Sequence, residues 1–227
     1  MKKIPKFAEL SYLLGLILLS LGAAMTAKSD FGVSMIVAPA YMISCKVDFL
    51  TFGMAEYLIQ ALLLAAMCIV MRRFRISYLF SFVTAMLYGA VLDFWVWALG
   101  GIPDDTLLAR IALYIAGLLL TTLGVSFFFH SYIPPESYDL FVREVSAHFG
   151  KDINIFKRWY DAASLAVAIL LSLALFGTVS SQYGLGIGTV ICTLLNGWLI
   201  GLFSRIIEKY FDFSPALDKL HRIVERY

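Results

Sequence analysis

The sequence contains few of the residues that hydrolytic or metal-dependent chemistry requires. Among its 227 residues there are 3 histidines and 3 cysteines. The cysteines, Cys45, Cys68 and Cys192, form no CxxC pair and have no ordered spacing to a histidine, so they predict neither a zinc site nor a disulfide framework. No nucleophile–histidine arrangement and no Gly-rich ATP-binding motif stands out. We therefore expect a protein that is not an enzyme and that binds no cofactor or metal.

Charge is also scarce. Only 15% of the residues are charged, and the formal net charge is +2. The basic side chains stand singly or in short groups between apolar segments and form no basic patch along the sequence. This distribution argues against a nucleic-acid partner.

Long apolar runs are abundant instead. Hydrophobic residues make up 61% of the chain and its mean hydropathy is +0.84, whereas a soluble domain has about 45–50% apolar residues. The apolar residues gather in blocks of roughly 20, the length that crosses a hydrocarbon layer of about 30 Å. The sequence therefore predicts an all-α membrane protein with six transmembrane helices. The blocks are Glu9 to Ala27, Thr51 to Met71, Ser77 to Leu99, Leu107 to Phe129, Trp159 to Thr178 and Leu185 to Ile207.

The placement of Lys and Arg predicts the orientation in the membrane, because these residues are retained on the cytoplasmic side. With a cytoplasmic N-terminus, all of the 18 Lys and Arg residues except Lys28, Lys46 and Arg110 fall in cytoplasmic segments. Adding or removing one helix would destroy this bias. We expect a bacterial inner-membrane protein whose N- and C-termini are both cytoplasmic.

Two stretches of the first half recur in the second. Leu21-Gly22 followed by Ser29 matches Leu123-Gly124 followed by Ser131, and the segment from Leu79 to Trp95 aligns with that from Ile187 to Phe203. Residues 1–105 and 106–208 are therefore predicted to be two three-helix repeats, with a cytoplasmic amphipathic tail at 209–227. Because three crossings is an odd number, the second repeat enters from the opposite side. Such inverted-topology repeats are found in many secondary transporters.

The segments after the first and fourth apolar blocks differ from ordinary loops. Asp30 to Ser44 is too apolar for water and too short to cross the membrane, which favours an interfacial or re-entrant piece. Ser131 to Gly150 predicts an amphipathic helix on the inner face, after Pro134-Pro135 has ended the fourth spanning helix. In the tail, Ser214 and Pro215 predict the start of a short cytoplasmic helix.

The Leu-Gly pairs, Tyr138-Asp139, Gly186-Ile187-Gly188-Thr189 and Asn196-Gly197 together resemble the YczE/YitT-like family of bacterial six-helix membrane proteins. The resemblance covers nearly the whole chain, and Gly-x-Gly-Thr is its most specific element. The first half has no second Gly-x-Gly-Thr and carries Leu79-Phe80-Ser81 in its place. The resemblance implies a transporter-like architecture but no particular substrate.

Three acidic residues inside the predicted spans are candidates for function, since a charge at a helix centre costs about 2.5–3.5 kcal/mol on insertion scales. Glu56 and Asp93 are predicted to bind a proton, a cation or a polar substrate in an outward-opening vestibule. Alternatively, each reaches water or a hydrogen-bond donor near the interface. Asp93 is the strongest candidate, because its counterpart in the second repeat is Gly201. For Asp161, a surface ion pair with its neighbours Lys157 and Arg158 is the main alternative.

Two polar stripes are predicted to meet near the midplane and to line a substrate site. The alternative is that their hydroxyl and amide groups bridge neighbouring helices, as is common in membranes. We expect Gly197 and Gly201 to pack closely against another helix. The glycines from Gly184 to Gly188 free a helix start that could meet an anionic group. The stripes consist of Ser81, Thr84 and Tyr88 in one repeat and of Thr189, Thr193 and Asn196 in the other.

Three functional readings follow. The first is a secondary transporter or permease for a small solute, working by alternating access between the two halves, with the lipid bilayer, the solute and a proton or cation as partners. The second is a membrane regulator or scaffold whose loop from Ser131 to Arg158 and tail engage a cytoplasmic protein. The third is the substrate-binding subunit of a vitamin uptake system.

Overall fold

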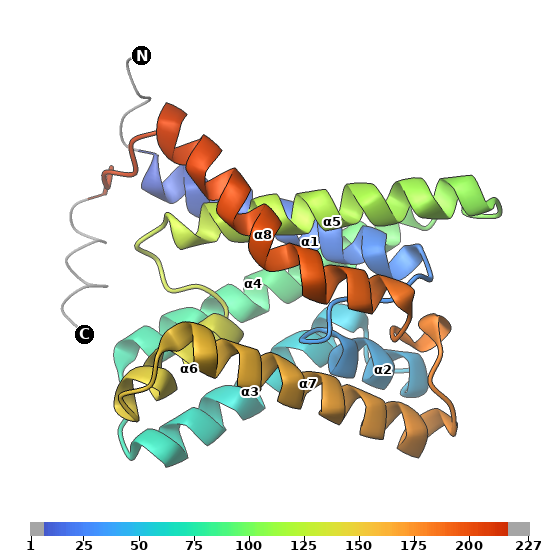
Figure 1. Cartoon of the computed structure of the whole chain (residues 1–227), viewed down its shortest axis with the longest axis horizontal. Helices are drawn as coiled ribbons and strands as arrows, with labels where there is room; N and C mark the ends of the chain where they lie inside the picture. Colours follow the sequence, from blue (N-terminus) through green and yellow to red (C-terminus); the bar gives the residue numbers. More distant parts are fainter. Residues whose placement is uncertain (1–6, 218–227) are drawn as a thin grey trace.

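The computed structural model describes residues 7–217, without the side chains of Ile76 and Asn154. All of the regular elements in this part of the chain are helices (Figure 1). In chain order they are α1 (Ala8–Lys28), α2 (Ala38–Lys46), α3 (Phe52–Met71), α4 (Ile76–Leu99), α5 (Leu107–Phe129), α6 (Ser137–His148), α7 (Ile153–Phe176), the 3-10 helix η1 (Ser181–Tyr183) and α8 (Ile187–Tyr210).

Six of these helices are long and apolar enough to cross a membrane: α1, α3, α4, α5, α7 and α8. They coincide with the six predicted blocks, so the prediction of six helices that can span a membrane is confirmed. The largest boundary difference is at α7, which begins at Ile153 rather than at Trp159. The helix starts early because the Asp152 carboxylate accepts a hydrogen bond from the Ile155 amide at 3.1 Å.

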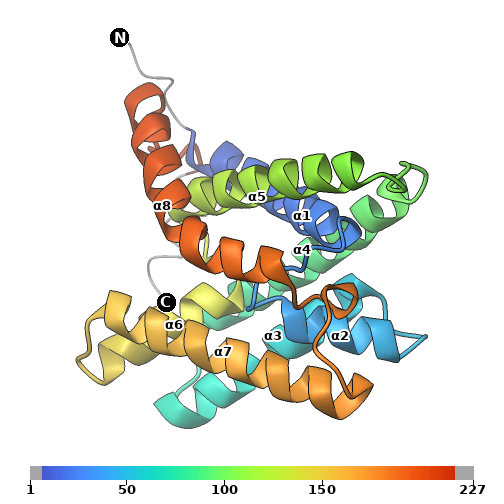
Figure 2. The ribbon, with the colours of Figure 1, turned by 45° about the vertical axis from the view of Figure 1, so that its right-hand side comes forward.

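Both ends of the described chain lie on the same side of the bundle (Figures 1 and 2). The Phe7 amide, just before α1, donates to the Asp212 carbonyl at 3.0 Å, just after α8. The Phe7 ring stacks on Phe211 with a centroid separation of 4.1 Å. This arrangement agrees with an even number of crossings. The predicted helix in the tail falls mostly on residues outside the described range.

Antiparallel packing of α1 against α5 forms the centre of the fold, where glycines bring the two backbones together (Figure 2). Gly15 faces Gly124, and Gly22 faces Gly117: a Cβ added to Gly15 would lie 3.1 Å from the Gly124 carbonyl oxygen, and one added to Gly117 would lie 2.9 Å from that of Gly22. Each helix therefore supplies two glycines to one crossing.

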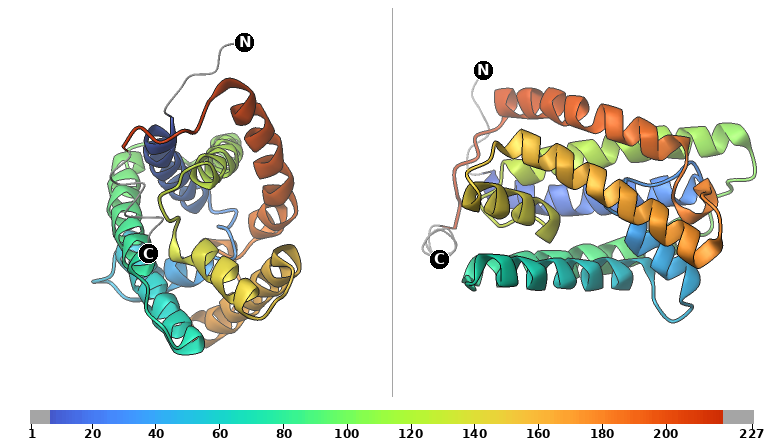
Figure 3. Two further views of the ribbon diagram at one scale, coloured as in Figure 1. Left: turned by 90° about the vertical axis from the view of Figure 1, so that its left-hand side faces the viewer. Right: turned by 60° about the horizontal axis from the view of Figure 1, so that its bottom comes forward.

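The two short helices pack across the molecule: α2 lies against α3 and α7, and α6 against α3 and α7 (Figure 3). The chain before α2 enters the bundle, where the Val33 amide donates to the Gly184 carbonyl at 2.9 Å. Val33 is buried. The segment is thus buried within the bundle, as a re-entrant piece would be, and we refer to residues 30–37 as the re-entrant segment. On the other side, α6 confirms the helix predicted between Ser131 and Gly150.

The two halves differ in how their last two long helices pack. α3 lies against α4, and a Cβ added to Gly89 would lie 2.6 Å from the Gly53 carbonyl oxygen. α7 has no comparable contact with α8 among the described residues. A Cβ added to Gly197 or Gly201 would meet no atom within 4 Å. The close helix packing predicted at these two glycines is therefore wrong, because α7 stands away from the α8 face that carries them.

Candidate functional site

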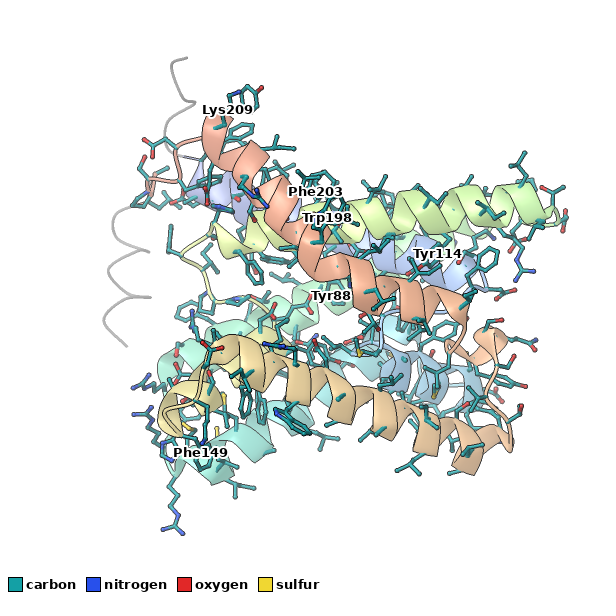
Figure 4. The ribbon with its side chains drawn as sticks, viewed as in Figure 1. Tyr88, Tyr114, Phe149, Trp198, Phe203 and Lys209 are labelled. Atoms are coloured by element: carbon teal, nitrogen blue, oxygen red, sulfur yellow. The ribbon has the colours of Figure 1, made fainter. Side chains whose placement is uncertain are left out.

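A cavity of about 400 Å³ lies between α1, α5 and α8 on one side and α6 and α7 on the other. In Figure 4, Tyr88 of α4 lies between these two groups of helices. The re-entrant segment contributes Ser34 to Val37 to the lining. Polar side chains that line the cavity are Tyr88, Thr121, Glu136, Tyr138, Asp139, Lys157, Arg158, Asp161, Thr193 and Asn196.

The loop before α6 places Glu136 at the wall of this cavity. Pro134 and Pro135 precede it, and α4 holds their carbonyls: the Ser81 hydroxyl donates to the Pro135 carbonyl at 2.7 Å, and the Thr84 hydroxyl to the Pro134 carbonyl at 3.1 Å. Ser81 and Thr84 therefore act on the loop, and the structure does not place them in the cavity lining.

Glu136 belongs to a buried cluster that joins α3 to the start of α6. The Gln60 side-chain nitrogen lies 3.4 Å from both Glu56 Oε2 and Glu136 Oε2. The Gln60 carbonyl oxygen accepts from the Ser137 amide at 3.0 Å, and the Tyr138 hydroxyl donates to Glu56 Oε2 at 2.9 Å. The amide of Gln60 thus stands between two carboxyl groups that would otherwise repel each other.

Both carboxyl groups are under-satisfied. Glu56 is fully buried and Glu136 is 9% exposed. Within residues 7–217, neither Glu56 Oε1 nor Glu136 Oε1 has a hydrogen-bond partner. Burial, and then the nearby charge of Glu56, raise the pKa of Glu136 well above its usual range. Burial also raises the pKa of the Tyr138 hydroxyl. Glu136 therefore holds a proton under conditions in which an exposed glutamate would be ionised.

The opposite wall carries further polar groups from α7 and α8. Lys157 forms an ion pair with Asp139 at 3.1 Å. Asp161 lines the cavity, and no partner for its Oδ1 exists in the described part of the chain. The Asn196 Oδ1 is likewise buried without a partner there. The structure thus places Asp161 in the cavity, and the ion pair of Lys157 is with Asp139 instead.

Two residues of the second polar stripe line the cavity, and the third stabilises the turn before α8. Thr193 and Asn196 line the cavity together with Tyr88. The Thr189 hydroxyl instead donates to the Gly184 carbonyl at 3.0 Å and fixes the turn before α8. The amide of Gly188 donates to the Phe31 carbonyl at 2.8 Å. The start of α8 is therefore engaged by the re-entrant segment at the point where an anion was expected.

Asp93 lies apart from all of these groups. Its carboxylate accepts hydrogen bonds from the Thr51 hydroxyl at 2.5 Å and from the Gly53 amide at 2.7 Å, so it satisfies the start of α3. It lines a second cavity, of about 590 Å³, together with Lys28 and Asp104. The expectation that Glu56 and Asp93 share one outer vestibule is wrong, because Glu56 points toward α6.

Sequence reasoning missed Glu136 and Gln60. Only acids inside the six apolar blocks were considered, and Glu136 follows two prolines in an apparent loop. A usable signal was the polar pair Ser81 and Thr84 on one face of α4, which binds the carbonyls of that loop. Gln60 stands one turn after Glu56 on the same face of α3 and could have been found from that spacing.

Comparisons with known proteins give a family but no activity. The model of a family of unknown function, DUF6198, matches residues 7–205. The chain is 30% identical over 204 residues to the uncharacterized protein YyaS of Bacillus subtilis (strain 168), covering 88% of this chain and 94% of that protein. No solved structure matches. The findings name no YczE/YitT-like protein, so that resemblance is supported only as far as a family of unknown function.

Proposed function

The chain belongs to the DUF6198 family of unknown function, and we propose that it is a secondary transporter that carries a small solute across the bacterial cytoplasmic membrane through the central cavity. The main support is Glu136, a buried acid that lines that cavity and whose carboxyl Oε1 has no hydrogen-bond partner in the described chain. Under-satisfied acids deep in a membrane protein are costly, and they commonly mark substrate or ion pathways.

The sequence repeat and the helix packing are both consistent with two inverted repeats, an arrangement that would support alternating access. The crossing of α1 and α5 pairs Gly15 with Gly124 and Gly22 with Gly117, and the sequence repeat aligns Gly22 with Gly124. Exchanging the two helices therefore reproduces the same pairs, as a two-fold axis in the membrane plane would require. The packing of α6 on α3 has its counterpart in α2 on α7, and that of α1 on α4 in α5 on α8.

The two halves depart from this symmetry at one place, which supports two alternating states. α3 is closed on α4 at Gly53 and Gly89, whereas the Gly89 counterpart, Gly197, faces the open cavity beside α7. If the halves exchange conformations, α8 closes on α7 while α4 separates from α3.

The distribution of Lys and Arg side chains indicates which end of the bundle is cytoplasmic. The end of the bundle that holds the start of α1 and the end of α8 also carries Arg73 and Arg75, which pair with Glu144 of α6. The opposite end carries Lys28 and Arg110. The positive-inside rule favours the first end as the cytoplasmic one.

Accessibility of the cavity from each side tests this proposal. In a variant without the natural cysteines, Gly197→Cys should react with a membrane-impermeant maleimide from one side at a time, and the favoured side should change with the state of the transporter. Gly101→Cys, in an exposed loop, is the matched control and should react from its own side only. Simultaneous reaction from both sides would indicate a channel, and protection from both sides would refute a transport pathway here.

A further inference from the structure

Building on the proposed transport function, we infer that the solute is a small organic cation bearing N–H donors, and that it exchanges for a proton at Glu136. The inference deepens the proposal by naming a substrate class and a coupling ion. It depends on which kinds of groups in the cavity lack partners, on the charge of the walls and on their apolar area.

Several side chains that line the cavity carry a polar atom without a hydrogen-bond partner in the described chain, and most of these atoms can accept a hydrogen bond. Glu136 Oε1, Asp161 Oδ1 and Asn196 Oδ1 have no hydrogen-bond donor within residues 7–217, and all three side chains line the cavity. The Thr121 hydroxyl, also unpartnered there, can act either way. Buried acceptors without donors are expensive, so a ligand that offers several donors gains the most. An ammonium or amidinium group offers several hydrogen-bond donors, whereas a carboxylate or phosphate offers only acceptors.

The ionisable side chains around Glu136 include more carboxyl groups than basic groups. Lys157 forms an ion pair with Asp139 at 3.1 Å, and Glu136, Asp161 and Arg158 also line the cavity. Glu56 adds a second carboxyl group behind Gln60. The titratable and charged groups around Glu136 are Tyr12 of α1, Glu56 of α3, Tyr88 of α4, Tyr138 and Asp139 of α6, and Lys157, Arg158, Tyr160 and Asp161 of α7.

The remaining lining favours an organic body over a bare ion. Leu19, Met35, Val37, Val125 and Phe128 contribute apolar surface to the same cavity. A volume of about 400 Å³ lies in the range of about 300–1,000 Å³ that is usual for small-molecule sites. No cluster of three or more potential metal ligands occurs among residues 7–217.

The exchange is balanced in atoms and charge. In the resting state the Glu136 carboxyl group is protonated and neutral, which its burial favours. When an alkylammonium ion binds, the O–H bond of Glu136 breaks, one proton leaves to water, and the carboxylate accepts an N–H hydrogen bond from the ammonium group. One positive charge thus replaces another, and Glu136 is ionised only while the ammonium group is bound to it.

Binding and proton release by the purified full chain in detergent test the inference without any transport assay. The probe is 2-phenylethylammonium, compared with neutral 2-phenylethanol and anionic 3-phenylpropanoate. Calorimetry in weak buffer with a pH indicator should show one proton released per ammonium bound. Affinity should rise with pH by up to about tenfold per unit below the pKa of Glu136, because the proton competes with the cation. The alcohol and the carboxylate should bind at least about tenfold more weakly.

Variants separate a role of Glu136 in binding from a role in folding. Glu136→Gln should lose proton release and weaken ammonium binding by about tenfold or more, the effect of one charge-assisted hydrogen bond. Glu136→Asp keeps a carboxyl group and should keep proton release even if its affinity falls. Glu208→Gln, the same change at an exposed site, is the matched control and should behave as the parent protein, with all thermal unfolding midpoints recorded.

Preference for the alcohol or the carboxylate, or unchanged proton release in folded Glu136→Gln, would overturn the inference. Failures of the two proposals can be told apart. Alternating reactivity of Gly197→Cys without ammonium binding overturns the substrate class and leaves transport standing. Ammonium binding with proton release, but without alternating reactivity, supports the exchange at Glu136 and overturns transport.

Discussion

Replacing Gly22 by alanine probes the helix crossing on which the two halves depend. A Cβ at this position would lie 2.5 Å from the Thr121 amide nitrogen and 2.6 Å from the Gly117 carbonyl oxygen, and it would also strike the Thr121 hydroxyl. Two of these three atoms belong to the α5 backbone, so rotation of a side chain cannot relieve the clash. Ordinary contact begins near 3.4 Å, which requires α1 and α5 to separate by about 1 Å at the crossing.

Such overpacking costs about 1–3 kcal/mol. For a chain of this size each kcal/mol shifts the unfolding midpoint by roughly 2–4 °C, so Gly22→Ala should lower the midpoint by about 2–12 °C. Nanoscale differential scanning fluorimetry in a fixed detergent measures this shift. Gly201→Ala is the matched control, because its Cβ meets nothing within 4 Å and alanine raises helix propensity by up to about 1 kcal/mol.

The two alanine variants should shift the unfolding midpoint in opposite directions, downward for Gly22→Ala and upward for Gly201→Ala. A midpoint for Gly22→Ala equal to or above that of Gly201→Ala would refute the close crossing of α1 and α5. Loss of folded protein in the Gly22→Ala preparation, with Gly201→Ala unaffected, would agree with it.

Three further predictions follow from the same structure. Asp93→Asn should lower the free energy of unfolding by about 1 kcal/mol, because the start of α3 loses a charged acceptor, and it should leave ammonium binding unchanged. Unfolding midpoints and calorimetry measure the two effects. A binding defect without destabilisation would instead give Asp93 a functional role. The pKa of Glu136 is raised in the folded state, so its contribution to stability is present below the pKa of the unfolded chain, about 4.3, and is lost as pH rises through the pKa of the folded chain. The unfolding midpoint should therefore decline less with rising pH in Glu136→Gln than in the parent protein. An equal decline in both proteins would contradict this assignment. A cysteine placed at Asp104 should react with an external maleimide and one at Arg73 should not, and the reverse pattern would invert the orientation.

Much of the fold could be predicted from the sequence, because it depends on local composition. An apolar block of about 20 residues forms a spanning helix wherever it stands in the chain, since every backbone group must be satisfied within the bilayer. α5 ends at Phe129, ahead of Pro134-Pro135, and α6 follows within the predicted segment. That Thr193 and Asn196 share one face of α8 was also predictable, because helical spacing sets the faces of a helix, and both residues line the cavity with Tyr88.

What the sequence could not determine is which partner each polar group meets. Asp93 and Glu136 are both acids, and the apolar block around Asp93 made it the stronger candidate. Only the tertiary structure shows that Asp93 satisfies the start of α3 while a loop held by Ser81 and Thr84 carries Glu136 into the bundle. Gly197 and Gly89 likewise could not be told apart from the sequence, because both are glycines within an apolar block. Whether a glycine packs or faces a cavity depends on the separation of two helices, and that separation is set by contacts between residues far apart in the sequence.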